Sequence, residues 1–95
     1  MTEEIRASHI LVETEAEAKN LYNEIKNGKS FSEVAQAVSI CPSGKNGGDL
    51  GFFGKGVMVK PFEDAAFALN EIGEISQPIE TQFGWHLIKL TDKKD

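Results

Sequence analysis

In two separated segments of this chain, residues 5–12 and residues 85–91, apolar residues recur with a period of two. This spacing predicts β-strands. Each segment has apolar residues on both of its faces, which is typical of a strand inside a sheet rather than at its edge. One face of each segment also holds a histidine, His9 in the first and His86 in the second. If these two strands pair, the histidines come close together.

Three other segments have apolar residues three and four positions apart, which predicts helices. The first two follow a hydroxyl residue with a glutamate three positions later, the spacing of a capping box, at Thr14 and at Ser30. The third begins near Pro61, because proline suits the first turn of a helix. The inward faces expected of the three helices are Ala18, Leu21, Tyr22 and Ile25; Phe31, Val34, Ala35 and Val38; and Phe62, Ala65, Ala66 and Leu69.

Six of the nine glycines lie within residues 44–56, which predicts a loop region interrupted by a short strand at 50–53, with an extra short helix as an option. Residues 75–79 alternate as a strand, and Pro78 places it at a sheet edge. Residues 81–84 form the turn into the last strand. The fold class is therefore α+β, a small, mostly antiparallel sheet packed by helices in the order β-α-α-β-α-β-β.

The 95 residues and 10.4 kDa predict one domain, residues 1–95, with a core of about 5–91. The net charge of −5 argues against nucleic acid as a partner. The single cysteine, Cys41, excludes an internal disulfide. No apolar run reaches the roughly 20 residues of a membrane span, and the acidic N-terminus lacks a secretory signal. We therefore expect a cytoplasmic monomer.

Cys41 and the two histidines allow more than one chemistry. A cysteine beside a histidine base could act as a nucleophile, and the same three residues could hold zinc with an open position. Buried histidines and a free cysteine are also common as plain core residues. A group of apolar residues, Leu50, Met58 and Phe62, surrounds the start of the third helix and could be either core or binding surface. These alternatives stay open on composition and spacing alone.

Four motifs together give a more specific indication. They are SHIL at residues 8–11, GDLGFF at 48–53, MVKPFEDAAF at 58–67 and TQFGWH at 81–86. In this order and at compatible separations, they resemble the parvulin family of peptidyl-prolyl cis/trans isomerases. The resemblance extends from about Ile5 to Leu90.

The resemblance implies a four-stranded antiparallel sheet surrounded by helices, with a shallow active site on one face. It implies that His9 and His86 are the paired histidines, that Thr81 joins their hydrogen-bond network, and that Cys41 occupies a position where parvulins have cysteine or aspartate. It further implies that the proline ring of a substrate enters a pocket of Leu50, Met58 and Phe62, with Phe83 at the rim. The partners implied are proline-containing peptides and unfolded or flexible protein segments. No cofactor and no metal are expected.

One departure from the family bears on specificity. Parvulins that prefer phosphorylated Ser or Thr before proline carry a basic loop after the first strand, whereas this chain has Glu13-Thr14-Glu15. We therefore expect no preference for phosphorylated substrates. The alternatives to an isomerase are a parvulin-like module that binds extended chains without catalysis and an enzyme that uses the Cys41 thiol.

Overall fold

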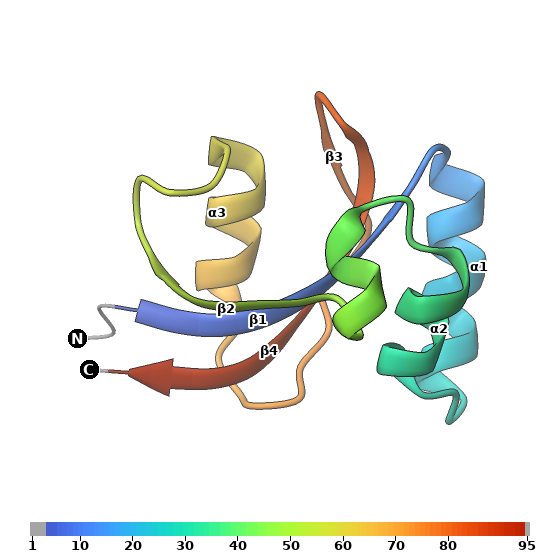
Figure 1. Ribbon diagram of the computed structural model, residues 1–95, viewed down its shortest axis with the longest axis horizontal. Coiled ribbons are helices and arrows are strands. Elements are labelled where there is room, and N and C mark those ends of the chain that lie inside the picture. Colours follow the sequence, from blue (N-terminus) through green and yellow to red (C-terminus); the bar gives the residue numbers. More distant parts are fainter. Residues whose placement is uncertain (1–3, 95) are drawn as a thin grey trace.

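A four-stranded antiparallel sheet forms the centre of the computed structural model, which describes residues 4–94 (Figure 1). The strands lie in the spatial order β2-β1-β4-β3. The two long strands, β1 and β4, are therefore the inner ones, and they pair from Glu4 opposite Lys94 to Val12 opposite Trp85. The strand bounds are β1 Glu4–Val12, β2 Asp49–Gly54, β3 Ile79–Thr81 and β4 Gly84–Lys94.

The helices pack on opposite faces of the sheet, α1 and α2 on one and α3 on the other. In Figure 1, α1 and α2 lie together at one end of the sheet and α3 lies at the other. Thr14 caps α1 by accepting the amide of Glu17, and Ser30 caps α2 by accepting the amide of Glu33, as the capping boxes predict. The helix bounds are α1 Glu15–Lys26, α2 Phe31–Val38 and α3 Lys60–Ala68, with a 3-10 helix η1 at Pro42–Asn46.

Two hydrophobic clusters result from the alternation along the inner strands. Ile10, Val12 and Leu87 pack under α1 and α2. Ile5, Ala7, Phe53, Ile88 and Leu90 pack under α3 instead. The prediction that β1 and β4 are buried on both faces is confirmed, and the histidines share the α3 face with the second set.

The structure differs from the sequence prediction at residues 75–79. Only Ile79 belongs to β3, and the earlier part makes a single isolated bridge, Ile75 opposite Lys89. Pro78 has no N–H to donate, and Ser76 accepts the amide of Ile88 through its side chain, so a regular ladder cannot form here.

Two smaller differences concern α2 and the glycine-rich segment. Val38, expected on the buried face of α2, is 38% exposed because the helix ends at that residue. The optional extra helix is present as η1, but it begins at Pro42, two residues before the glycine-rich segment, and overlaps only the start of that segment. None of the helices in residues 4–94 has the length and apolarity that crossing a membrane demands.

Candidate active site

His9 and His86 lie side by side on the α3 face of the sheet. His9 pairs with Ile88 and His86 pairs with Leu11, so the histidines are diagonal neighbours on the two inner strands. Their rings are stacked with centroids 5.2 Å apart and planes inclined by 16°, and the two Nδ1 atoms are 3.0 Å apart. Both side chains are buried. The pairing expected from alternation is thus present.

A chain of hydrogen bonds extends from this pair in both directions. On one side, His86 Nε2 lies 2.7 Å from Thr81 Oγ1, which also accepts the amide of Phe83. On the other side, His9 Nε2 lies 3.0 Å from Ser43 Oγ, and the Ser43 hydroxyl donates to Cys41 Sγ at 3.3 Å. Cys41 therefore reaches the histidines through Ser43 and not directly.

The direction of each bond follows from the number of protons available. Ser43 gives its only proton to Cys41, so it accepts the Nε2 proton of His9. A neutral His9 then has a bare Nδ1, which accepts the Nδ1 proton of His86. The bare Nε2 of His86 finally accepts the hydroxyl proton of Thr81. Two neutral imidazoles satisfy every bond in the chain with no proton left over.

The electrostatics of the site agree with this arrangement. Burial, and to a smaller extent the adjacent His86, lowers the pKa of His9 to about 4. Burial likewise lowers the pKa of His86 to about 4. Both rings are consequently neutral at pH 7, as the chain of single protons requires.

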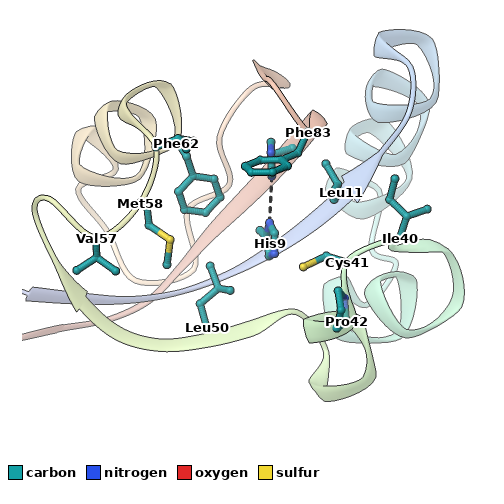
Figure 2. Close-up of a pocket in the computed structure, with 12 residues that line it drawn as sticks. His9, Leu11, Ile40, Cys41, Pro42, Leu50, Val57, Met58, Phe62 and Phe83 are labelled. Atoms are coloured by element: carbon teal, nitrogen blue, oxygen red, sulfur yellow. Dashed lines mark hydrogen bonds between the residues drawn. The ribbon is translucent and has the colours of Figure 1, made fainter.

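Above the histidines is a cavity of about 500 Å³ with almost entirely apolar walls (Figure 2). The wall on the side of α3 consists of Leu50, Val57, Met58, Val59 and Phe62. The opposite wall consists of Leu11, Ile40, Cys41, Pro42 and Phe83. His9 lies between the two walls in Figure 2, with a dashed line marking its bond to His86. Among residues 4–94, no Lys, Arg, Asp or Glu side chain lines this cavity.

Phe62 connects this pocket to the hydrophobic core. Its ring meets both imidazoles edge-on, at centroid distances of 5.4 Å from His9 and 5.3 Å from His86. The residue is only 3% exposed and packs in the cluster beneath α3. Phe62 therefore fixes the orientation of the histidines as well as forming part of the wall.

The structure brings all eight predicted site residues together. Seven of them line the cavity: His9, Cys41, Leu50, Met58, Phe62, Phe83 and His86. Thr81 is the eighth, and it contacts the site through His86. The sequence analysis missed Ser43, although a hydroxyl two residues after Cys41 is a signal for such a bond. It also missed Ile40 and Val57, which are 54% and 66% exposed and line the rim.

The two other chemistries considered for Cys41 find little in this geometry. Within residues 4–94, no three His, Cys, Asp or Glu side chains converge as metal ligands. An activated cysteine needs a neighbouring base to take its proton. The Cys41 thiol instead accepts a hydrogen bond from the hydroxyl of Ser43, which is not such a base.

Comparison with known proteins identifies relatives over nearly the whole chain. Residues 4–92 match the family model described as "Rotamase: PPIC-type PPIASE domain". The protein named foldase protein PrsA 1 of Bacillus cereus is 53% identical over 93 residues, which are 97% of this chain and 32% of that protein. Foldase protein PrsA of Geobacillus kaustophilus is 52% identical over 91 residues, 95% of this chain and 32% of that protein. This chain thus spans about a third of the length of these curated relatives.

Solved structures agree with these matches. The crystal structure of the peptidylprolyl isomerase PrsA from Bacillus anthracis superposes with a TM-score of 0.95 at 48% identity, covering 99% of this chain and 43% of that one. The solution structure of NmPin, the parvulin of Nitrosopumilus maritimus, gives a TM-score of 0.85 at 47% identity and covers 96% of this chain and 98% of that one. The second match shows that the same unit occurs as a nearly complete chain.

Proposed function

This chain belongs to the PPIC-type peptidyl-prolyl cis/trans isomerase (PPIase) domain family, and we propose that it accelerates rotation about X–Pro bonds in peptides and in unfolded or flexible protein segments. The observation that carries the proposal is the apolar cavity directly above two neutral, hydrogen-bonded imidazoles. An isomerase needs such a cavity, and it needs no metal, cofactor or covalent step.

The physical problem is the partial double bond of the amide. Rotation about it faces a barrier of about 18–20 kcal/mol, and uncatalysed exchange takes on the order of tens of seconds or longer. In the twisted transition state the amide has lost its conjugation and is less polar than in the planar ground state. An apolar cavity therefore binds the twisted form better than the planar one, which is the condition for catalysis.

The residues of the site divide this work between them. Leu50, Met58 and Phe62 hold the proline ring while the rest of the peptide rotates. The chain from Thr81 through His86, His9 and Ser43 to Cys41 lies beneath the rotating bond and keeps the shape of the cavity fixed. The donors of these side chains are already bonded to one another, so the site adds little polarity that would favour the planar amide.

The acidic residues beside the site support a preference for substrates without phosphate. Glu13 follows β1 directly, two positions after the cavity residue Leu11, and both Glu13 and Glu15 are exposed. The cavity lining contributed by the described part of the chain offers no Lys or Arg to pair with a phosphate. A phosphoserine before proline would therefore lose its hydration without gaining a cationic partner.

The natural substrates we propose are unfolded or flexible proteins, since the apolar cavity can receive a proline ring only where the chain around it is accessible. Relatives carry the name foldase, which supports a role in protein folding for this chain. The monomeric state and the cytoplasmic location remain predictions from the sequence.

The decisive experiment measures exchange between cis and trans Ala-Pro in a short peptide by NMR, with and without the protein. We expect exchange well above the uncatalysed rate, and a marked loss in Met58→Ala. Phe52→Ala is the matched control, because Phe52 is 42% exposed and lies outside the cavity. Peptide binding without faster exchange would instead identify a noncatalytic binding module. The same measurement on Ser-Pro and phosphoserine-Pro peptides tests the expected lack of phosphate preference.

A further inference from the structure

Residues 55–59 join β2 to α3 and carry three residues of the cavity wall, Val57, Met58 and Val59. We refer to this segment as the Met58 loop. It has no regular secondary structure before α3, and its tip is open, with Val57 66% exposed. A loop of this kind does not hold a side chain at a fixed place by its own backbone alone. Something outside the loop must therefore hold Met58 opposite Leu50 and Phe62.

Glu63, in the first turn of α3, makes a side-chain contact with this loop. Its carboxylate Oε1 accepts the backbone amide of Gly56 at 2.6 Å. Among residues 4–94, this is the one hydrogen bond between a side chain and the Met58 loop. Gly56 is two residues before Met58 and has a φ of +91°, a conformation that glycine adopts without strain. The turn at Gly56 thus directs its N–H at the carboxylate.

The environment of Glu63 is unusual for a glutamate. The side chain of Glu63 is 10% exposed, whereas that of its neighbour Asp64 is 60% exposed. Lys60 lies 3.7 Å from Glu63 and 3.0 Å from Asp64, so its charge is shared and its main partner is Asp64. A buried carboxylate is costly unless it is hydrogen-bonded, and here the Gly56 amide provides that bond. A glutamate placed only for the helix dipole would not need burial.

We propose that Glu63 is a positioning residue, which fixes the Met58 loop against α3 and so keeps the proline pocket formed. Glu63 does not contact the cavity itself and acts through Gly56 and Met58. The proposal rests on the proposed isomerase function only for its effect on rate. Its effect on the position of Met58 can be measured without any activity.

Three variants test the proposal: Glu63→Ala, which removes the acceptor; Glu63→Gln, which keeps an acceptor oxygen; and Asp64→Ala, the matched control on the same turn with the same Lys60 partner. Glu63→Ala should raise the KM for an Ala-Pro peptide by about tenfold while kcat falls less than threefold, because a mobile Met58 loop weakens binding of the ring. Glu63→Gln should stay within about threefold of the original protein in both constants, and Asp64→Ala should be unchanged. The Met58 methyl signal in NMR should shift and broaden in Glu63→Ala alone.

Several results would overturn the proposal. It fails if Glu63→Ala leaves the Met58 methyl signal and KM unchanged, if Asp64→Ala has the same effect, or if Glu63→Gln is as damaging as Glu63→Ala. If Glu63→Ala does not fold, hydrogen exchange in the unaltered protein still decides: the Gly56 amide should be protected, and fast exchange there contradicts the bond. An inactive original protein would overturn the proposed function, whereas the Met58 methyl signal and the Gly56 amide would still report on Glu63.

Discussion

At the scale of residues, burial of two neutral imidazoles makes stability depend on pH. The pKa of each histidine is about 4 in the folded state and about 6.5 in the unfolded chain, so the unfolded chain binds more protons between these values. The stability that depends on the two neutral histidines is thus fully present above pH 6.5 and is lost as the pH falls toward 4. For two protons the slope reaches about 2.7 kcal/mol per pH unit.

Thermal or denaturant unfolding between pH 5 and pH 7 measures this slope, above the range where most carboxylates titrate. A double substitution, His9→Gln with His86→Gln, should flatten it. Isomerase activity should stay level from pH 8 to about 5.5 and decline as the pH approaches 4, when the hydrogen-bond chain acquires extra protons. Imidazole NMR signals of the folded protein that titrate near pH 6.5 would refute this interpretation.

Replacement of Cys41 separates a network role from covalent catalysis. Because its thiol accepts a hydrogen bond from Ser43, we expect Cys41→Ser and Cys41→Asp to retain kcat/KM within roughly tenfold of the original. A covalent mechanism predicts that both variants, and the protein alkylated by iodoacetamide, lose activity almost completely.

Replacement of Ser43 tests the same hydrogen-bond network. Ser43→Ala should lower kcat/KM by about tenfold, since it leaves the buried Nε2 proton of His9 without an acceptor.

At the scale of elements, the two sides of the β2–α3 connection respond differently to truncation. Met58 is half-buried at the cavity, whereas Phe62 in α3 is 3% exposed and belongs to the core. Met58→Ala should therefore lower kcat/KM with a loss in stability below about 2 kcal/mol, whereas Phe62→Ala should cost about 3–5 kcal/mol. Thermal unfolding recorded alongside turnover gives both quantities. A similar loss of stability in both variants would place Met58 in the core.

The turn residue Gly48, just before β2, holds His9 in place by a close approach of backbones. The amide of His9 donates to the carbonyl of Gly48, and a Cβ on Gly48 would lie 2.2 Å from the carbonyl oxygen of His9. Gly48→Ala should therefore destabilise the fold by more than about 3 kcal/mol. Gly51→Ala is the control, because Gly51 also has a positive φ but has open space around it, and it should lose only about 1–2 kcal/mol. Equal losses in urea unfolding would show that backbone conformation alone accounts for both effects.

The sequence pattern predicted those strands and helices that are determined by one local factor, either burial along a strand or a cap within one helical turn. Apolar residues at both odd and even positions of β1 and β4 report burial on both faces, and the period of two, together with pairing of these strands, placed His9 and His86 close together. Thr14 and Ser30 cap their helices through contacts within one turn, which sequence spacing contains. The strand prediction for residues 75–79 was wrong in part, because alternation does not reveal that the side chain of Ser76 accepts the amide of Ile88 in β4 where a regular strand would use a backbone carbonyl.

The missed features of the site depend on contacts between distant segments. Ser43 reaches His9 across 34 residues, and only the folded η1 brings its hydroxyl there. Glu63 has the sequence context of an ordinary acidic residue in a first helical turn, and its burial follows from the course of the Met58 loop. Resemblance to a family identified the pocket residues, whereas the role of these two polar groups needed the structure.

At the scale of the whole molecule, three of the four large apolar residues within 4–94 that are more than half exposed lie around one opening, and the fourth, Ile72, lies outside it. Ile40, Val57 and Phe83 are each more than half exposed and all line the cavity, so occupation by a substrate covers them. We therefore expect a monomer of 10.4 kDa by sedimentation at micromolar concentration. A dimer that dissociates when a proline peptide is added would show instead that each copy covers the cavity of the other.

The pairing of Glu4 with Lys94 has a mechanical consequence. Because β1 and β4 are antiparallel, both ends of the sheet's inner pair leave the molecule side by side (Figure 1). A force that pulls these two ends apart acts on one pair of hydrogen bonds at a time and opens the strands like a zipper, beginning at Glu4 and Lys94. The pulling force reaches the histidines only after the outer part of the ladder has separated. Stretched by its ends, this domain should therefore yield at low force, although its centre is buried on both faces.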